Sequence, residues 1–157
     1  MIRFEVERDG LWPEVCGDLP EPCAAALRGL GLPEPLTGEV SVLFASDEEV
    51  RALNRDFRGK DAATNVLSFP ADPVPGLPAD HQPLGDLALA YETCAREAGA
   101  RGVSVSDHTA HLLVHGLLHL LGYDHRDGGE ARAMEALEVR ALALMGIASP
   151  YEDEPAD

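Results

Sequence analysis

The stretch HGLLHLLGYDH, residues 115–125, has histidines at its first, fifth and last positions and Gly122 at its eighth. It closes a predicted helix over 106–121. Glycine can adopt a left-handed conformation that ends a helix, so we expect the chain to turn back after Gly122. His115 and His119 would then share one helix face, and His125 would approach them from another direction.

These three histidines match the usual ligand set of a catalytic metal site. Three neutral imidazoles with one open coordination position are typical of catalytic zinc, whereas structural zinc usually has four ligands that include thiolates. The three cysteines, at 16, 23 and 94, lie far from the stretch. We therefore predict one Zn²⁺ per chain, bound by His115, His119 and His125. Nickel and copper also suit three histidines, so the spacing leaves the metal open.

Position 116 separates this stretch from the zinc-peptidase motif HExxHxxGxxH. In that motif, glutamate follows the first histidine and acts as general base for the metal-bound water. Here the residue is Gly116, so peptide hydrolysis by that mechanism is disfavoured. A cation together with an arginine could still stabilise the charge that develops during phosphodiester cleavage.

The sequence leaves open the roles of two neighbouring side chains, His111 and Asp124. His111 lies one turn before His115 and could orient a ligand, act as a fourth ligand, or pack beside the site. Asp124 could orient a ligand imidazole through its second N–H, or be a turn residue. We expect His108 to be exposed.

The rest of the chain predicts an α/β fold. Residues 71–83 are rich in proline and read as an irregular loop. We expect a mixed sheet of about four strands, a helical C-terminal part, a single domain over 1–151 and an acidic, disordered tail over 152–157. The predicted strands are 2–8, 38–45, 64–70 and 84–91, and the predicted helices are 22–32, one opening at 47, 92–100, 106–121 and 129–146.

Composition narrows the function classes. A formal charge of −16 disfavours indiscriminate binding to nucleic acid, because such binding depends on cations at phosphates. No apolar stretch is long enough to cross a bilayer, and sparse cysteines argue against disulfides, so we expect a cytoplasmic protein. Acidic residues are interspersed among the clustered cations, which favours a solvated helix face over a basic patch; these cations are Arg51, Arg55, Arg58 and Lys60.

The histidine stretch resembles the signature of the YbeY-type endoribonucleases, also called rRNA maturation factors. The matching segments cover most of 40–151, while the first forty residues match only in general layout. Asn65 stands where many relatives have aspartate. The further matching segments are NRDFRGKDAATNVLSFP (54–70), LGDLAL (84–89), AHLLVHG (110–116), AMEALE (133–138) and the Pro-Tyr pair at 150–151.

The resemblance implies a small α/β fold and a zinc-dependent endoribonuclease specific for single-stranded RNA. Such an enzyme would act in ribosomal RNA maturation, chiefly at the 3′ end of the small-subunit RNA, and in ribosome quality control. Its partners would be precursor RNA and small-subunit ribosomal proteins. Arg58 and His115 would be the catalytic residues, and Arg51, Arg55 and Lys60 are candidate RNA contacts.

Two other functions stay open from the sequence. One is a metal-dependent hydrolase on another substrate such as peptide, and the other is a non-catalytic zinc-binding factor in ribosome assembly. The sequence also leaves open whether water or the RNA 2′-hydroxyl is the nucleophile, which residue acts as base, where the RNA is cut, and the oligomeric state.

Overall fold

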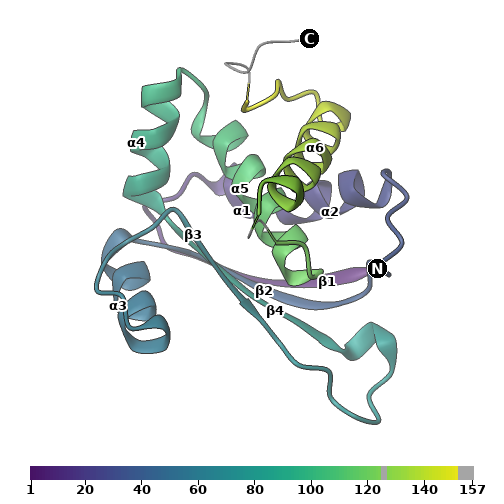
Figure 1. Cartoon of the computed structure of the whole chain (residues 1–157). Coiled ribbons are helices and arrows are strands. Elements are labelled where there is room, and N and C mark those ends of the chain that lie inside the picture. Colours follow the sequence, from purple (N-terminus) through teal and green to yellow (C-terminus); the bar gives the residue numbers. More distant parts are fainter. Residues whose placement is uncertain (125–126, 152–157) are drawn as a thin grey trace.

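The computed structural model describes residues 1–124 and 127–151, and in them one mixed four-stranded sheet carries most of the helices on one face and α3 on the other (Figure 1). The strand order is β1-β2-β4-β3, with β1, β2 and β4 parallel and β3 antiparallel to β4 at one edge. In chain order the elements are β1 (Ile2–Arg8), α1 (Glu14–Gly17), α2 (Pro20–Arg28), β2 (Gly38–Ala45), α3 (Asp47–Arg58), β3 (Val66–Pro70), the 3₁₀ turn η1 (Ala79–His81), β4 (Pro83–Ala90), α4 (Tyr91–Arg101), α5 (Val105–Leu120) and α6 (Gly128–Leu144). The expected fold class is confirmed.

Each face of the sheet has its own apolar core. Side chains alternate between the faces of a strand, so Leu87 of β4 packs into the larger core with α2, α5 and α6. Its neighbour Ala88 packs on the opposite face with Leu67 of β3 and Val50 of α3. Helix α3 therefore lies across the sheet from α5.

Helix α5 is the central helix of the larger core. It packs against β3 and β4 and also against α2, α4 and α6. Its buried residues include Leu113, Val114, Leu117 and Leu118, each 1% exposed or less. Burial of one such side chain stabilises the folded protein by roughly 1.5–3 kcal/mol. The helix that carries the candidate ligands is thus anchored on several sides.

The predicted boundaries agree best where a local pattern defines them. Strands over 2–8 and 38–45 are observed as predicted, and α3 begins at Asp47 after a capping box between Ser46 and Glu49. Helix α5 begins at Val105 rather than at the predicted 106, because Ser104 caps it: its Oγ accepts the Asp107 N–H at 3.0 Å.

Other boundaries differ by a few residues. Strand β3 begins at Val66 rather than at 64, and Ala79–His81 form a 3₁₀ turn inside the proline-rich loop. The short helix α1 was not anticipated. The predicted tail, 152–157, lies outside the described residues. None of the helices in the described ranges has the length and apolarity needed to cross a membrane.

Candidate active site

Two of the predicted metal ligands face each other on α5. His115 and His119 are one turn apart, and their Nε2 atoms are 3.1 Å from one another. Two imidazole ligands about 2.0–2.1 Å from a tetrahedral ion would have nitrogens roughly 3.3 Å apart. The observed pair of nitrogens therefore fits two adjacent positions around one metal ion.

The third predicted ligand, His125, lies outside the described residues, and within those residues no group of three metal-ligating side chains forms. The turn that leads to it is described. Gly122 has φ +101°, its N–H donates to the His119 carbonyl at 3.0 Å, and the Tyr123 N–H donates to the Leu118 carbonyl at 3.0 Å. These bonds end α5 as the sequence predicts.

A carboxylate from α6 orients the first ligand. Glu138 is buried, and its Oε2 lies 2.7 Å from His115 Nδ1. Burial alone would raise the pKa of Glu138, but hydrogen bonds from His111, His115 and Tyr151 outweigh it and lower this pKa to about 2. An ionised carboxylate only accepts hydrogen bonds, so His115 carries its proton on Nδ1. In the neutral ring this tautomer leaves Nε2 unprotonated, as a metal ligand must be.

His111 contacts the other oxygen of the same carboxylate. Its Nε2 is 2.8 Å from Glu138 Oε1, so this nitrogen faces α6 and is engaged there. His111 Nδ1 is buried and has no hydrogen-bond partner among the described residues, which fits a neutral ring protonated on Nε2. Of the three interpretations, the geometry favours a residue that orients a ligand, acting through Glu138.

The sequence reasoning did not identify Glu138 or Tyr151 as site residues. Tyr151 donates its O–H to Glu138 Oε1 at 2.6 Å. One feature could have revealed the carboxylate: it lies four positions after Met134 and three before Ala141, on the face that α6 buries. A charged residue in an apolar helix face generally has a specific partner.

Gly116 of α5 packs directly against Leu87 of β4. A Cβ atom added there would be 2.8 Å from Leu87 Cδ2 and 3.4 Å from Ser68 Oγ. The position that holds the general base in the peptidase motif is therefore filled by the neighbouring strands. A glutamate at this position would therefore meet the Leu87 side chain.

Arg58 faces the histidines across a hollow of about 560 Å³, which His115, His119 and Asp124 also line. Arg58 is the last residue of α3, and Gly59 ends the helix in a left-handed conformation. The Nη2 of Arg58 donates to the Ser68 carbonyl at 2.7 Å, and the guanidinium carbon of Arg58 lies 5.5 Å from the Phe69 ring centroid. Among the described residues that line the hollow, Arg58 is the only one with a permanent positive charge.

The other predicted cations lie away from the lining of this hollow. Arg51 forms two hydrogen bonds with Asp61, at 2.7 and 3.0 Å. Arg55 contacts Asp56 at 3.1 Å, and Lys60 is exposed after the end of α3. The arrangement agrees with a solvated helix face for these residues and sets Arg58 apart from them.

The expectation that His108 is exposed is wrong. Only 4% of its surface is accessible, and its Nε2 lies 2.8 Å from Glu97 Oε1. Glu97 also accepts a hydrogen bond from Asn65 Nδ2 at 3.0 Å. An aspartate at 65 could not donate this bond, so the asparagine is matched to its neighbour. The network holds Asn65 at the rim of the hollow.

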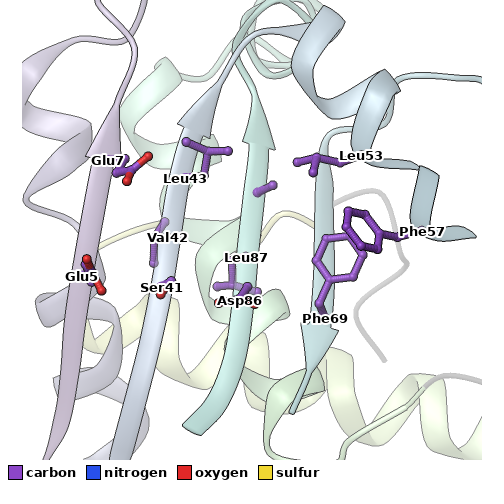
Figure 2. A pocket seen from close by; sticks show the side chains of 11 residues that line it. Glu5, Glu7, Ser41, Val42, Leu43, Leu53, Phe57, Phe69, Asp86 and Leu87 are labelled. Carbon is purple, nitrogen blue, oxygen red and sulfur yellow. The ribbon is translucent and has the colours of Figure 1, made fainter. Parts of the chain in front are cut away.

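A second hollow, of about 450 Å³, lies on the opposite face of the sheet beside α3 (Figure 2). Glu5 and Glu7 point into it from β1 and Asp86 from β4, and Phe57 and Phe69 form its other side. Its described lining contains no histidine and no arginine. The chemistry of the candidate site therefore belongs to the hollow between Arg58 and the histidines.

Comparison with known proteins gives consistent matches. A family model described as endoribonuclease YbeY matches residues 21–146. Relatives named Endoribonuclease YbeY from Erythrobacter litoralis and Halorhodospira halophila are 49% and 54% identical over 164 and 117 residues. These matches cover 97% and 74% of this chain and 98% and 76% of the relatives. The solution structure of TM1509 from Thermotoga maritima has a similar fold, with a TM-score of 0.58 at 24% identity over 100% of this chain and 99% of that one.

Proposed function

This chain belongs to the endoribonuclease YbeY family, and on that premise we propose that it is a zinc-dependent endoribonuclease specific for single-stranded RNA. It acts in the maturation of ribosomal RNA, at the 3′ end of the small-subunit RNA, and in ribosome quality control. The observation that carries the proposal is the shared hollow in which Arg58 faces His115 and His119.

The residues of the hollow divide the chemistry between two walls. His115 and His119 would hold the metal from α5, and His125 is the third ligand expected from the sequence. When bound, zinc supplies a Lewis acid that polarises a phosphate oxygen or activates a water molecule. Arg58 places a planar guanidinium on the opposite wall, where it pairs with phosphate oxygens and stabilises the negative charge that grows during cleavage.

The acidity of the chain bears on how RNA reaches this hollow. With a formal charge of −16, most of the surface repels a phosphate backbone. Arg51 and Arg55 already face Asp61 and Asp56, so among the arginines of α3 the contact with RNA concentrates at Arg58. Proteins of the small ribosomal subunit then bring the enzyme to its substrate in the cytoplasm.

A direct test compares RNA with peptide. The purified full-length chain, stripped of metal and reloaded with zinc, should cut a single-stranded RNA oligonucleotide, fail to cut the matching duplex, and leave an unstructured polypeptide intact. Cleavage of the polypeptide without cleavage of RNA would support a hydrolase on another substrate. Absence of cleavage of both, in a protein that binds zinc, would support a non-catalytic assembly factor.

The ends of the RNA product identify the nucleophile. A 2′,3′-cyclic phosphate forms only when the neighbouring 2′-hydroxyl attacks, whereas direct attack by water leaves a linear phosphate. An RNA with a single deoxynucleotide at the cut site provides the control, because it blocks the first route and permits the second.

A further inference from the structure

The carboxylate of Glu138 is completely enclosed. It has 0% of its surface exposed, and its neighbours on the buried face of α6 include Met134, Ala141 and Leu142. An ionised carboxylate in such surroundings is strongly unfavourable unless hydrogen bonds replace those it had with water. Three donors do so here, His111 and His115 from α5 and Tyr151 from the C-terminal segment.

The C-terminal segment is held in place so that Tyr151 reaches this carboxylate. Arg101 Nη2 donates to the Pro150 carbonyl at 2.7 Å, and the Tyr151 N–H donates to Ser149 Oγ at 3.1 Å. The Tyr151 ring packs edge-on against His111, with centroids 5.6 Å apart. Burial and the adjacent Glu138 carboxylate raise the pKa of Tyr151 above its usual value, so its hydroxyl stays protonated and donates.

We propose that Glu138 and Tyr151 are positioning residues that fix His115 in the tautomer needed for metal binding. Tyr151 and His111 both occupy Oε1, which leaves Oε2 for the Nδ1–H of His115. That bond fixes the ring and leaves Nε2 unprotonated toward His119. The inference deepens the proposed metal site and rests on it, and it makes the C-terminal segment part of the site's support.

Replacing Glu138 with glutamine separates this role from simple packing. The amide is nearly isosteric with the carboxylate but has one accepting oxygen and one donating NH₂ group. The oxygen is expected to face the two donors, Tyr151 and His111, so the NH₂ group faces His115 Nδ1. That nitrogen must then lose its proton, and Nε2 gains one that competes with the metal.

The test measures two properties of the full-length chain. Imidazole ¹⁵N shifts of the metal-free protein report the His115 tautomer, and competition with a chromophoric chelator reports zinc affinity. We expect Nδ1–H in the wild type and predominantly Nε2–H in Glu138→Gln. Zinc affinity should fall by about 10–100-fold in Glu138→Gln and by about tenfold in Tyr151→Phe, the range for partners that orient a metal ligand.

Tyr91→Phe is the matched control, because it removes the same hydroxyl from a ring that packs on Trp12; it should leave tautomer and affinity unchanged. A Glu138→Gln protein that keeps the Nδ1–H tautomer and wild-type affinity would overturn the proposal. A Tyr151→Phe protein with the same zinc affinity as Tyr91→Phe would also overturn it. This second comparison gives a result even if Glu138→Gln fails to fold. If the wild type binds no zinc, the proposed function fails. The tautomer measurement still decides whether Glu138 fixes the tautomer of His115.

Discussion

The two walls of the hollow are built in opposite ways. On the histidine wall, His115 is fixed by a completely buried carboxylate that accepts three hydrogen bonds, all at 2.8 Å or less. On the arginine wall, the exposed Arg58 is held through one bond to a strand carbonyl and by the ring of Phe69. The first wall suits a metal-ligating side chain whose orientation must be set before the metal binds. The second suits a cation that adjusts to a flexible substrate.

The largest expected effect follows from breaking the histidine wall. Replacing His119 with alanine removes a direct ligand, so zinc affinity should fall by more than about a hundredfold, beyond the effect of losing an orienting partner. RNA cleavage should disappear with the metal. Metal analysis of the purified protein, together with a cleavage assay, measures both.

His81→Ala is the control for this substitution. His81 lies in the exposed turn η1, where its Nδ1 is 4.0 Å from a carboxylate oxygen of Glu39. It should retain wild-type zinc content and activity. A His119→Ala protein with wild-type zinc affinity would show that the ion is bound elsewhere.

The arginine wall should respond differently. Arg58→Ala is expected to lower the rate of RNA cleavage by about 10²–10³-fold. This is the usual cost of removing one preorganised hydrogen-bond donor that stabilises a transition state. Zinc content should be unchanged, and stability should change by less than about 1 kcal/mol because the side chain is exposed. Arg55→Ala, one turn earlier on α3, should cut RNA at close to the wild-type rate. If Arg58→Ala also cuts normally, the role assigned to it is wrong.

A third substitution tests why the histidine wall lacks the peptidase glutamate. Gly116→Glu forces a charged side chain between α5 and Leu87, so the protein should lose about 3 kcal/mol of stability through overpacking and burial of charge. Gly99→Glu is the control, since Gly99 is exposed in α4 with nothing within 4 Å of an added Cβ. Chemical denaturation measures both. A Gly116→Glu protein of normal stability that cleaves peptide would contradict this explanation.

The two walls also differ in how far the sequence predicts them. Spacing alone predicts the approach of His115 to His119 and the turn at Gly122, because both follow from the geometry of one helix. Glu138 and Arg58 belong to other helices, and their positions depend on how α6 and α3 pack around the sheet. Arg58 was identified through a family resemblance. Glu138 was included in a matching segment without a role, since no local pattern indicates which histidine a distant carboxylate will meet.

The smallest expected effect concerns the cations beside the arginine wall. Arg51 and Asp61 have side chains 57% and 53% exposed, and an ion pair this exposed to solvent contributes little. Arg51→Ala should therefore leave the thermal midpoint almost unchanged and weaken RNA binding by less than about fivefold. Asp61→Asn should strengthen binding slightly at low salt by releasing Arg51, and this gain should vanish as salt screens the charges. Titrations of a labelled single-stranded RNA at two salt concentrations measure both variants. If Arg51→Ala instead matched the loss of cleavage in Arg58→Ala, the arginine wall would be an extended basic surface, and the contrast between one adjustable cation and a preset metal site would no longer hold.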